Sequence, residues 1–82
     1  MSQTQDLSIT KDEGWVEVAT GKSSGYFAGN SGYFTQYESL PPENHNGFRL
    51  ESFGYRYELK SGESLYVKTD RRQSFFAIIP DA

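Results

Sequence analysis

The sequence FGYRYEL at residues 53–59, with ESLYVKT at 63–69 and SFFAIIP at 74–80, decides the fold of this chain. In the first two stretches large apolar side chains alternate with polar ones, which is the pattern of a β-strand with one buried face. The segments between the stretches are short and polar, as turns are. We therefore predict three consecutive antiparallel strands, to which the upstream residues are added.

The turn at residues 60–62 sets the register of the first two strands. A two-residue loop would mix their apolar and polar faces, because a slip of one residue turns a strand over. A three-residue loop instead places Tyr57 opposite Leu65, and it puts Gly62 where a type I turn with a bulge needs a left-handed residue. The sequence thus predicts a hairpin with this register.

The third strand is apolar on both faces. Phe76 and Ile78 share one face, while Phe75, Ala77 and Ile79 share the other. A strand of this kind is buried on both sides, whereas one layer of a small domain covers only one side. We expect a second copy of the chain to cover the other face.

Length and composition exclude several classes of protein. The chain has 82 residues and forms one domain at most, with a core that is marginal for its size. It has no cysteine and a single histidine, which excludes disulfides and argues against a structural zinc site. Oligomerisation is therefore the expected source of further stability. The net charge of −3, with both signs along the chain, gives no nucleic-acid footprint, and no apolar run is long enough to span a membrane.

Residues 1–13 are polar apart from Met1, Leu7 and Ile9, and they lack the character of a signal peptide. We predict a flexible N-terminal arm over 1–13, followed by a single β domain over 14–82. The alternation from Leu7 to Thr10 leaves a second possibility, in which the arm adds as a short strand to a neighbouring sheet edge.

The rest of the chain supplies further short strands. Residues 15–20, 33–39 and 48–52 have strand patterns, 25–32 form a glycine-rich loop or edge, and 40–47 form a loop that contains two prolines and Asn-Gly. About five or six strands and no helical pattern predict an all-β fold. We expect a small antiparallel β-sandwich or barrel with a flexible N-terminal arm.

No set of nucleophile, base and acid can be assembled from the sequence. His45 lies in the loop with the prolines, where a solvent-exposed side chain is expected. The acidic residues on strands fit a polar sheet face, and phosphate loops, EF-hands and dinucleotide fingerprints are absent. We expect a protein that is no enzyme and binds no cofactor.

Aromatic residues make up 16% of the chain, more than one small core can hold. The surplus indicates either a protein interface or a surface that stacks on sugar rings. The candidates for stacking are Trp15, Tyr26 and Tyr33. The basic pair Arg71-Arg72 marks a solvated turn or, alternatively, a contact with an acidic patch of a partner.

The C-terminal pattern YELKSGESLYVKT at 57–69, followed by FAIIP at 76–80, resembles the end of many short bacteriophage virion proteins. The resemblance covers residues 48–82 and consists mainly of strand and turn pattern. It implies a structural virion component, often a trimer, that decorates a capsid or belongs to a neck or fibre-attachment complex. It implies no catalytic residue, and it places the protein in a virion that assembles in the host cytoplasm.

These observations favour a non-enzymatic virion structural protein that forms a homo-oligomer, expected to be a homotrimer, and binds a viral capsid or neck protein. The residues expected at its interfaces are apolar, aromatic or basic, namely Phe75, Ile79, Tyr26, Tyr33, Arg71 and Arg72. One alternative is a carbohydrate-binding or other ligand-binding β module that uses its aromatic residues. Another is a small inhibitor of a host protein.

Overall fold

The structure is a computed structural model that describes residues 4–50 and 54–81. The described residues form eight strands and one short 3₁₀ turn. In chain order these elements are β1 (Gln5–Ile9), η1 (Lys11–Glu13), β2 (Val16–Thr20), β3 (Ser23–Gly29), β4 (Gly32–Tyr37), β5 (Phe48–Leu50), β6 (Tyr55–Leu59), β7 (Ser64–Lys68) and β8 (Ser74–Pro80).

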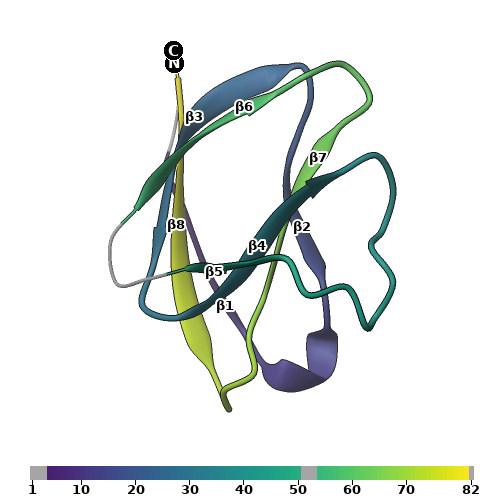
Figure 1. Ribbon diagram of the computed structural model, residues 1–82. Coiled ribbons are helices and arrows are strands. Elements are labelled where there is room, and N and C mark those ends of the chain that lie inside the picture. The colour runs from purple at the N-terminus through teal and green to yellow at the C-terminus, as the bar shows by residue number, and fades with distance from the viewer. Residues whose placement is uncertain (1–3, 51–53, 82) are drawn as a thin grey trace.

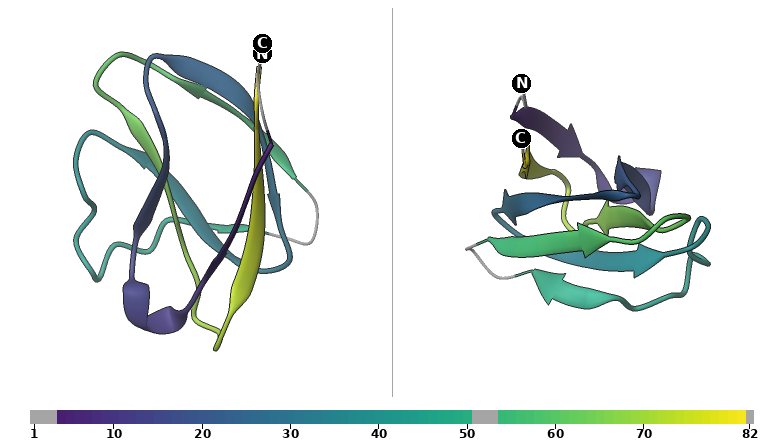
Figure 2. Two further views of the ribbon diagram at one scale, coloured as in Figure 1. Left: turned by 180° about the vertical axis from the view of Figure 1, so that it is seen from behind. Right: turned by 90° about the horizontal axis from the view of Figure 1, so that it is seen from above.

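The strands form two four-stranded antiparallel sheets that pack face to face (Figure 1). Sheet A has the order β1-β8-β3-β6, and sheet B has the order β2-β7-β4-β5. The first half of the chain pairs with the second half in reverse, so that β1 pairs with β8, β2 with β7, β3 with β6 and β4 with β5. This order is that of a double-sheet jelly roll. Figure 2 shows the same layers from behind and from above.

The prediction of a small all-β sandwich is confirmed, with eight described strands in place of five or six. The core lies between the sheets, where alternate side chains of both meet. Its buried apolar residues are Ile9, Phe27, Leu50, Tyr57, Leu59, Leu65, Val67, Phe76 and Ile78. The loop expected over 40–47 contains no strand. The described residues include no helix with the length and apolarity needed to cross a membrane.

The predicted hairpin is wrong, because β6 and β7 belong to different sheets. β6 pairs with β3, whereas β7 pairs with β2 and β4. The intervening turn still forms, with Glu63 N–H donating to the Lys60 carbonyl at 3.0 Å and Gly62 at φ 89°. Tyr57 and Leu65 therefore belong to opposite walls of the core. β7 and β8 also belong to different sheets, so the three C-terminal strands are not neighbours in one sheet.

The N-terminal segment expected to be a flexible arm instead contains strand β1. Its residues pair with β8 in a continuous antiparallel register from Gln5–Ile78 to Ile9–Ser74. The Leu7–Ile9 alternation directs Ile9 into the core, where 1% of its surface is exposed. The expected addition to a sheet edge thus occurs within the chain itself. Residues 1–3 of the predicted arm, and 51–53 of the predicted strands, lie outside the described residues.

Residues 25–29 of the glycine-rich segment 25–32, which was expected to be a loop or edge, belong to β3, an inner strand of sheet A between β8 and β6; residues 30–31 form the bend that follows. The glycines of β3 allow close packing rather than flexibility. A Cβ at Gly29 would lie 2.6 Å from a ring carbon of Phe76 and 2.7 Å from a methyl group of Leu50. Sequence reasoning treated glycine here as a turn signal, whereas its small size is what the two neighbouring side chains require.

Asp81 fastens the end of β8 to the two strands beside it. Its carboxylate accepts hydrogen bonds from Ser24 Oγ at 2.8 Å and from Arg56 Nη2 at 2.5 Å. Its backbone N–H donates to the Ser24 carbonyl at 3.0 Å. The bond from Ser24, followed by the interaction with Arg56, lowers the pKa of the Asp81 carboxyl below its ordinary value of 3.8.

We expect Asp81→Asn to remove a pH-dependent part of the stability. Because the folded pKa is lowered, the carboxylate stabilises the fold above pH 3.8, and this contribution is lost as pH falls through the lower folded value. Urea unfolding should show the wild type more stable than Asp81→Asn at neutral pH, with a difference that shrinks in acid. A difference that is constant across pH would contradict this assignment.

Candidate functional site

The outer face of sheet A carries exposed apolar side chains from β8. Phe76 and Ile78 point into the core, while 56% of the surface of Phe75 and 42% of that of Ile79 are exposed. Ala77, between them on the same face, is partly exposed. The strand is therefore apolar on both faces, as the sequence indicates, and one face remains uncovered in the single chain.

Tyr26 on β3 extends this apolar face. It lies opposite Ile79 in the β3–β8 register, and 43% of its surface is exposed. Its ring covers Gly54, where a Cβ would be 2.5 Å from the Tyr26 ring. The structure thus brings together three of the residues expected at an interface, Tyr26, Phe75 and Ile79, on two adjacent strands.

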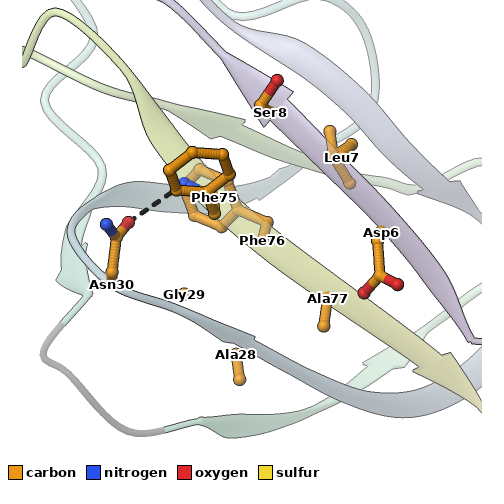
Figure 3. A pocket seen from close by; sticks show the side chains of 9 residues that line it. All are labelled: Asp6, Leu7, Ser8, Ala28, Gly29, Asn30, Phe75, Phe76 and Ala77. Carbon is orange, nitrogen blue, oxygen red and sulfur yellow. Dashed lines mark hydrogen bonds between the residues drawn. The ribbon is translucent and has the colours of Figure 1, made fainter.

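A hollow of about 690 Å³ lies on this face next to Phe75 (Figure 3). It is lined by three consecutive residues from each of three chain segments, namely Asp6, Leu7, Ser8, Ala28, Gly29, Asn30, Phe75, Phe76 and Ala77. The middle residues of the three segments are register partners across the strands. The residues on either side of these middle residues form two rows that run across the strands. One row contains the small side chains Ala28 and Ala77, and the other contains Phe75.

Asn30 holds the backbone that carries Phe75. Its side-chain oxygen accepts a hydrogen bond from Phe75 N–H at 3.0 Å, which Figure 3 shows as a dashed line. Its own N–H donates to the Phe75 carbonyl at 3.2 Å. This pair of bonds fixes the start of β8 against the end of β3, so the position of Phe75 at the rim of the hollow is determined by the sheet.

Charged side chains lie at the sides of this apolar face and not at its centre. Asp6 is on edge strand β1 opposite Ala77, and Arg56 is on edge strand β6 opposite Tyr26, where it binds Asp81. An apolar centre with polar sides is the usual arrangement of a protein interface. The face is suited to recognition by shape and apolar burial.

The other residues expected at a site lie elsewhere. Tyr33 is on β4 of sheet B, where its hydroxyl donates to Asp70 at 3.3 Å. Arg71 and Arg72 are exposed in the turn between β7 and β8. Trp15 precedes β2, and only 6% of its surface is exposed, which differs from the open stacking platform that the sequence suggested. Trp15, Tyr26 and Tyr33 do not form one surface.

Trp15 belongs instead to a packed cluster on the outer side of sheet B. Lys68 Nζ lies 4.7 Å from the centroid of the Trp15 ring and donates to the His45 carbonyl at 3.0 Å. His45 Nε2 is 3.1 Å from Thr35 Oγ1, and its ring packs against Tyr37 at 4.9 Å between centroids. The loop histidine expected to be solvent-exposed is half-buried and fastens its loop to sheet B.

A second hollow, of about 630 Å³, borders this cluster. Its lining is mainly charged and comes from residues 11–15, 40–43 and 68–70. Trp15 Nε1 has no hydrogen-bond partner among the described residues, but the atom is itself buried. Within residues 4–50 and 54–81, no group of three or more acidic or histidine side chains could hold a metal ion.

Two buried tyrosines have raised pKa values. Burial, followed by the charge of Asp81, raises the pKa of Tyr57. Burial, followed by the charge of Glu17, raises the pKa of Tyr66, whose hydroxyl lies 3.5 Å from Glu17 Oε2. Both phenols therefore stay protonated at neutral pH, and the Tyr66 hydroxyl donates to Glu17.

The small and polar residues that shape the first hollow were not found by sequence reasoning. Asp6, Ser8, Ala28 and Asn30 meet Phe75 only because β1, β3 and β8 are neighbours in sheet A. The signals in the sequence that pointed to this surface were the apolar outer face of β8 and the aromatic surplus that singled out Tyr26. No family model, curated protein or solved structure matches the chain, so its function is argued from the outer face of sheet A.

Proposed function

We propose that this protein is a non-enzymatic structural component of a bacteriophage virion. In this proposal it forms a homo-oligomer and binds a larger viral assembly, as a capsid decoration or as a head or neck component. The observation that carries the proposal is the set of exposed apolar side chains on the outer face of sheet A, Tyr26, Phe75 and Ile79.

Burial of this face would favour association. Removing apolar surface from water contributes about 25 cal/mol per Å², and aromatic side chains are enriched where proteins meet. Phe75 and Ile79 lie on the same strand and Tyr26 lies beside Ile79, so the three can be covered by one partner. A second copy of the chain supplies that partner, and the remaining surface is available to a capsid or neck protein.

The topology and the sequence resemblance support a role in a virion. Jelly rolls occur in viral capsid proteins and also in lectins, so the topology alone does not assign a function. The residues that resemble phage virion proteins, 57–69 and 76–80, correspond to the second half of β6, to β7 and to most of β8. β8 also carries the exposed apolar face. A virion component of this kind would assemble in the host cytoplasm.

We expect Phe75→Asp combined with Ile79→Asp to abolish self-association without unfolding the chain. Both side chains are exposed, so the substitutions add charge to the face and leave the core intact. Light scattering over a range of concentrations should give a multiple of 9.3 kDa for the wild type and 9.3 kDa for the variant.

The matched control is Leu40→Asp combined with Phe48→Asp, which removes two exposed apolar side chains that do not belong to sheet A. This control should retain the mass of the wild type. A folded Phe75→Asp, Ile79→Asp variant with the wild-type mass would show that the outer face of sheet A is not the interface. A wild type of 9.3 kDa at every concentration would contradict self-association itself.

A further inference from the structure

We propose that the Asn46–Gly47 bond is a site of spontaneous modification, at which Asn46 loses its side-chain amide and is converted to aspartate and isoaspartate. The site lies in the loop over 40–47, between β4 and β5 (Figure 1). The isoaspartate product loosens this loop from sheet B. The modification goes beyond the proposed function and does not depend on it.

The reaction is a ring closure between neighbouring groups of the chain, and asparagine is one of the thermolabile residues for this reason. The backbone nitrogen of Gly47 attacks the side-chain carbonyl carbon of Asn46 and loses its proton. The bond from that carbon to the amide nitrogen breaks, and ammonia leaves. One water molecule then opens the five-membered ring at either of its two carbonyl groups, which gives aspartate or isoaspartate. No oxidant or reductant is needed, because no atom changes its oxidation state.

The structure leaves both reacting groups of this bond unengaged. The side chain of Asn46 is exposed and forms no hydrogen bond with any other described residue. The Gly47 N–H likewise has no acceptor within residues 4–50 and 54–81. Glycine also has no Cβ beside this nitrogen, so nothing on residue 47 hinders the approach of the Asn46 side chain. Ring closure at Asn46 therefore requires no native hydrogen bond to break.

The two other asparagines of the chain lack these conditions. Asn44 is exposed in the same loop, but the N–H that follows it, that of His45, donates to the carbonyl three residues earlier at 2.9 Å. The side-chain oxygen of Asn30 is engaged by the Phe75 N–H at 3.0 Å. Ring closure at either residue would have to break the bond named here. The chain thus contains its own comparison, in which Asn46 is expected to react first.

Isoaspartate at position 46 would lengthen the main chain between two fixed points. On one side, the His45 carbonyl accepts a hydrogen bond from Lys68 Nζ at 3.0 Å. On the other side, Gly47 packs so closely on Trp15 that a Cβ would lie 2.6 Å from the ring. In isoaspartate the main chain runs through the side chain and gains one carbon between these points. We therefore expect the loop to shift and Trp15, of which 6% of the surface is exposed, to become more accessible.

Peptide mapping by mass spectrometry tests the modification. The full chain is incubated folded, at physiological temperature and mildly alkaline pH, and each asparagine is then followed by fragmentation of its peptide. A sample digested without incubation corrects for reaction during the digestion. Asn46 should be converted severalfold faster than Asn44 and Asn30, with isoaspartate among the products. Asn46→Gln is the matched control, because it keeps the amide but would need a six-membered ring, and this position should stay unmodified.

The fluorescence of Trp15 tests the consequence for the loop. The incubated protein should show an emission shifted to longer wavelength, whereas the incubated Asn46→Gln variant should keep that of fresh wild type. Freshly prepared Asn46→Asp carries the charge of the product without the longer main chain, and it should also keep the wild-type emission. This variant separates the effect of the added charge from that of the added carbon.

The contrary outcomes are distinct. Conversion of Asn44 or Asn30 as fast as Asn46, or conversion of Asn46 only in urea, would overturn the proposal, since the folded structure would then not select the site. Conversion to aspartate alone would overturn the isoaspartate product. Incubated protein with the emission of fresh Asn46→Asp would overturn the loosening of the loop. None of these results bears on the proposed function, whose test is the mass in solution.

Discussion

Phe27→Ala is expected to lower the free energy of unfolding by about 3–5 kcal/mol, the usual cost of truncating a buried phenylalanine. Phe27 is on β3 of sheet A, and 1% of its surface is exposed. Its ring packs edge-on against Phe34 of sheet B at 5.0 Å between centroids, and it lies 6.1 Å from Tyr55. The ring therefore joins the two sheets, and its removal leaves a cavity between them.

The magnitude is large for a chain of this size. Typical stabilities of about 0.05–0.15 kcal/mol per residue give roughly 4–12 kcal/mol for such a domain, so Phe27→Ala removes a large share of the total. Equilibrium urea unfolding, followed by the fluorescence of the buried Trp15, measures the loss. Phe27→Leu should give a smaller loss and remains measurable if the alanine variant is unfolded.

Phe48→Ala is the matched control, because it removes the same side chain from a position where 66% of its surface is exposed. Its ring packs on Phe34 from the solvent side at 5.7 Å between centroids, so a small loss is expected. Equal losses for the two variants would show that Phe27 does not join the sheets in the way its packing indicates.

The pattern of alternating side chains predicted which faces of the strands are buried but not which strands are neighbours. Leu59 and Leu65 both point into the core, as the alternation indicates. A hairpin would place them on one face, whereas the chain crosses from sheet A to sheet B between them. Both arrangements need the same alternation and the same glycine turn, so local sequence cannot distinguish them.

The N-terminal strand was predicted only as the alternative to a flexible arm, for a related reason. β1 has only Leu7 and Ile9 as apolar residues, too few to indicate a strand by themselves. Its order comes from pairing with β8, more than sixty residues away in the chain. Backbone hydrogen bonds form whatever the side chains are, so they leave no pattern in the sequence. A polar segment can therefore become a strand of a sheet although its own composition does not predict a strand.

The candidate site was predictable in part. Phe75 and Ile79 could be identified because a strand with apolar side chains on both faces needs a cover on each side. The recess beside Phe75 could not, because it depends on Ala28 and Ala77 being opposite each other across β3 and β8. Alanine on a strand has no functional signature. Its importance here comes from the larger side chains that surround it.

Gly25→Ala is expected to destabilise the fold by about 3 kcal/mol, at the upper end of the cost of overpacking. Gly25 is buried on β3, where it lies opposite Tyr57 on one side and Pro80 on the other. An added Cβ would be 2.5 Å from the Ile79 carbonyl oxygen and 2.8 Å from the Cα of Pro80. These are backbone atoms, so the clash is relieved only if β3 moves away from β8.

Gly62→Ala separates this steric effect from the conformational freedom of glycine. Gly62 has a left-handed φ of 89°, but no atom lies within 4 Å of the position its Cβ would take. Its substitution should cost about 1–2 kcal/mol through backbone strain alone. Urea unfolding of both variants measures the difference. If Gly25→Ala cost no more than Gly62→Ala, β3 and β8 would not be packed as closely as the clash requires, and the face formed by Tyr26 and Ile79 would lose its rigid base.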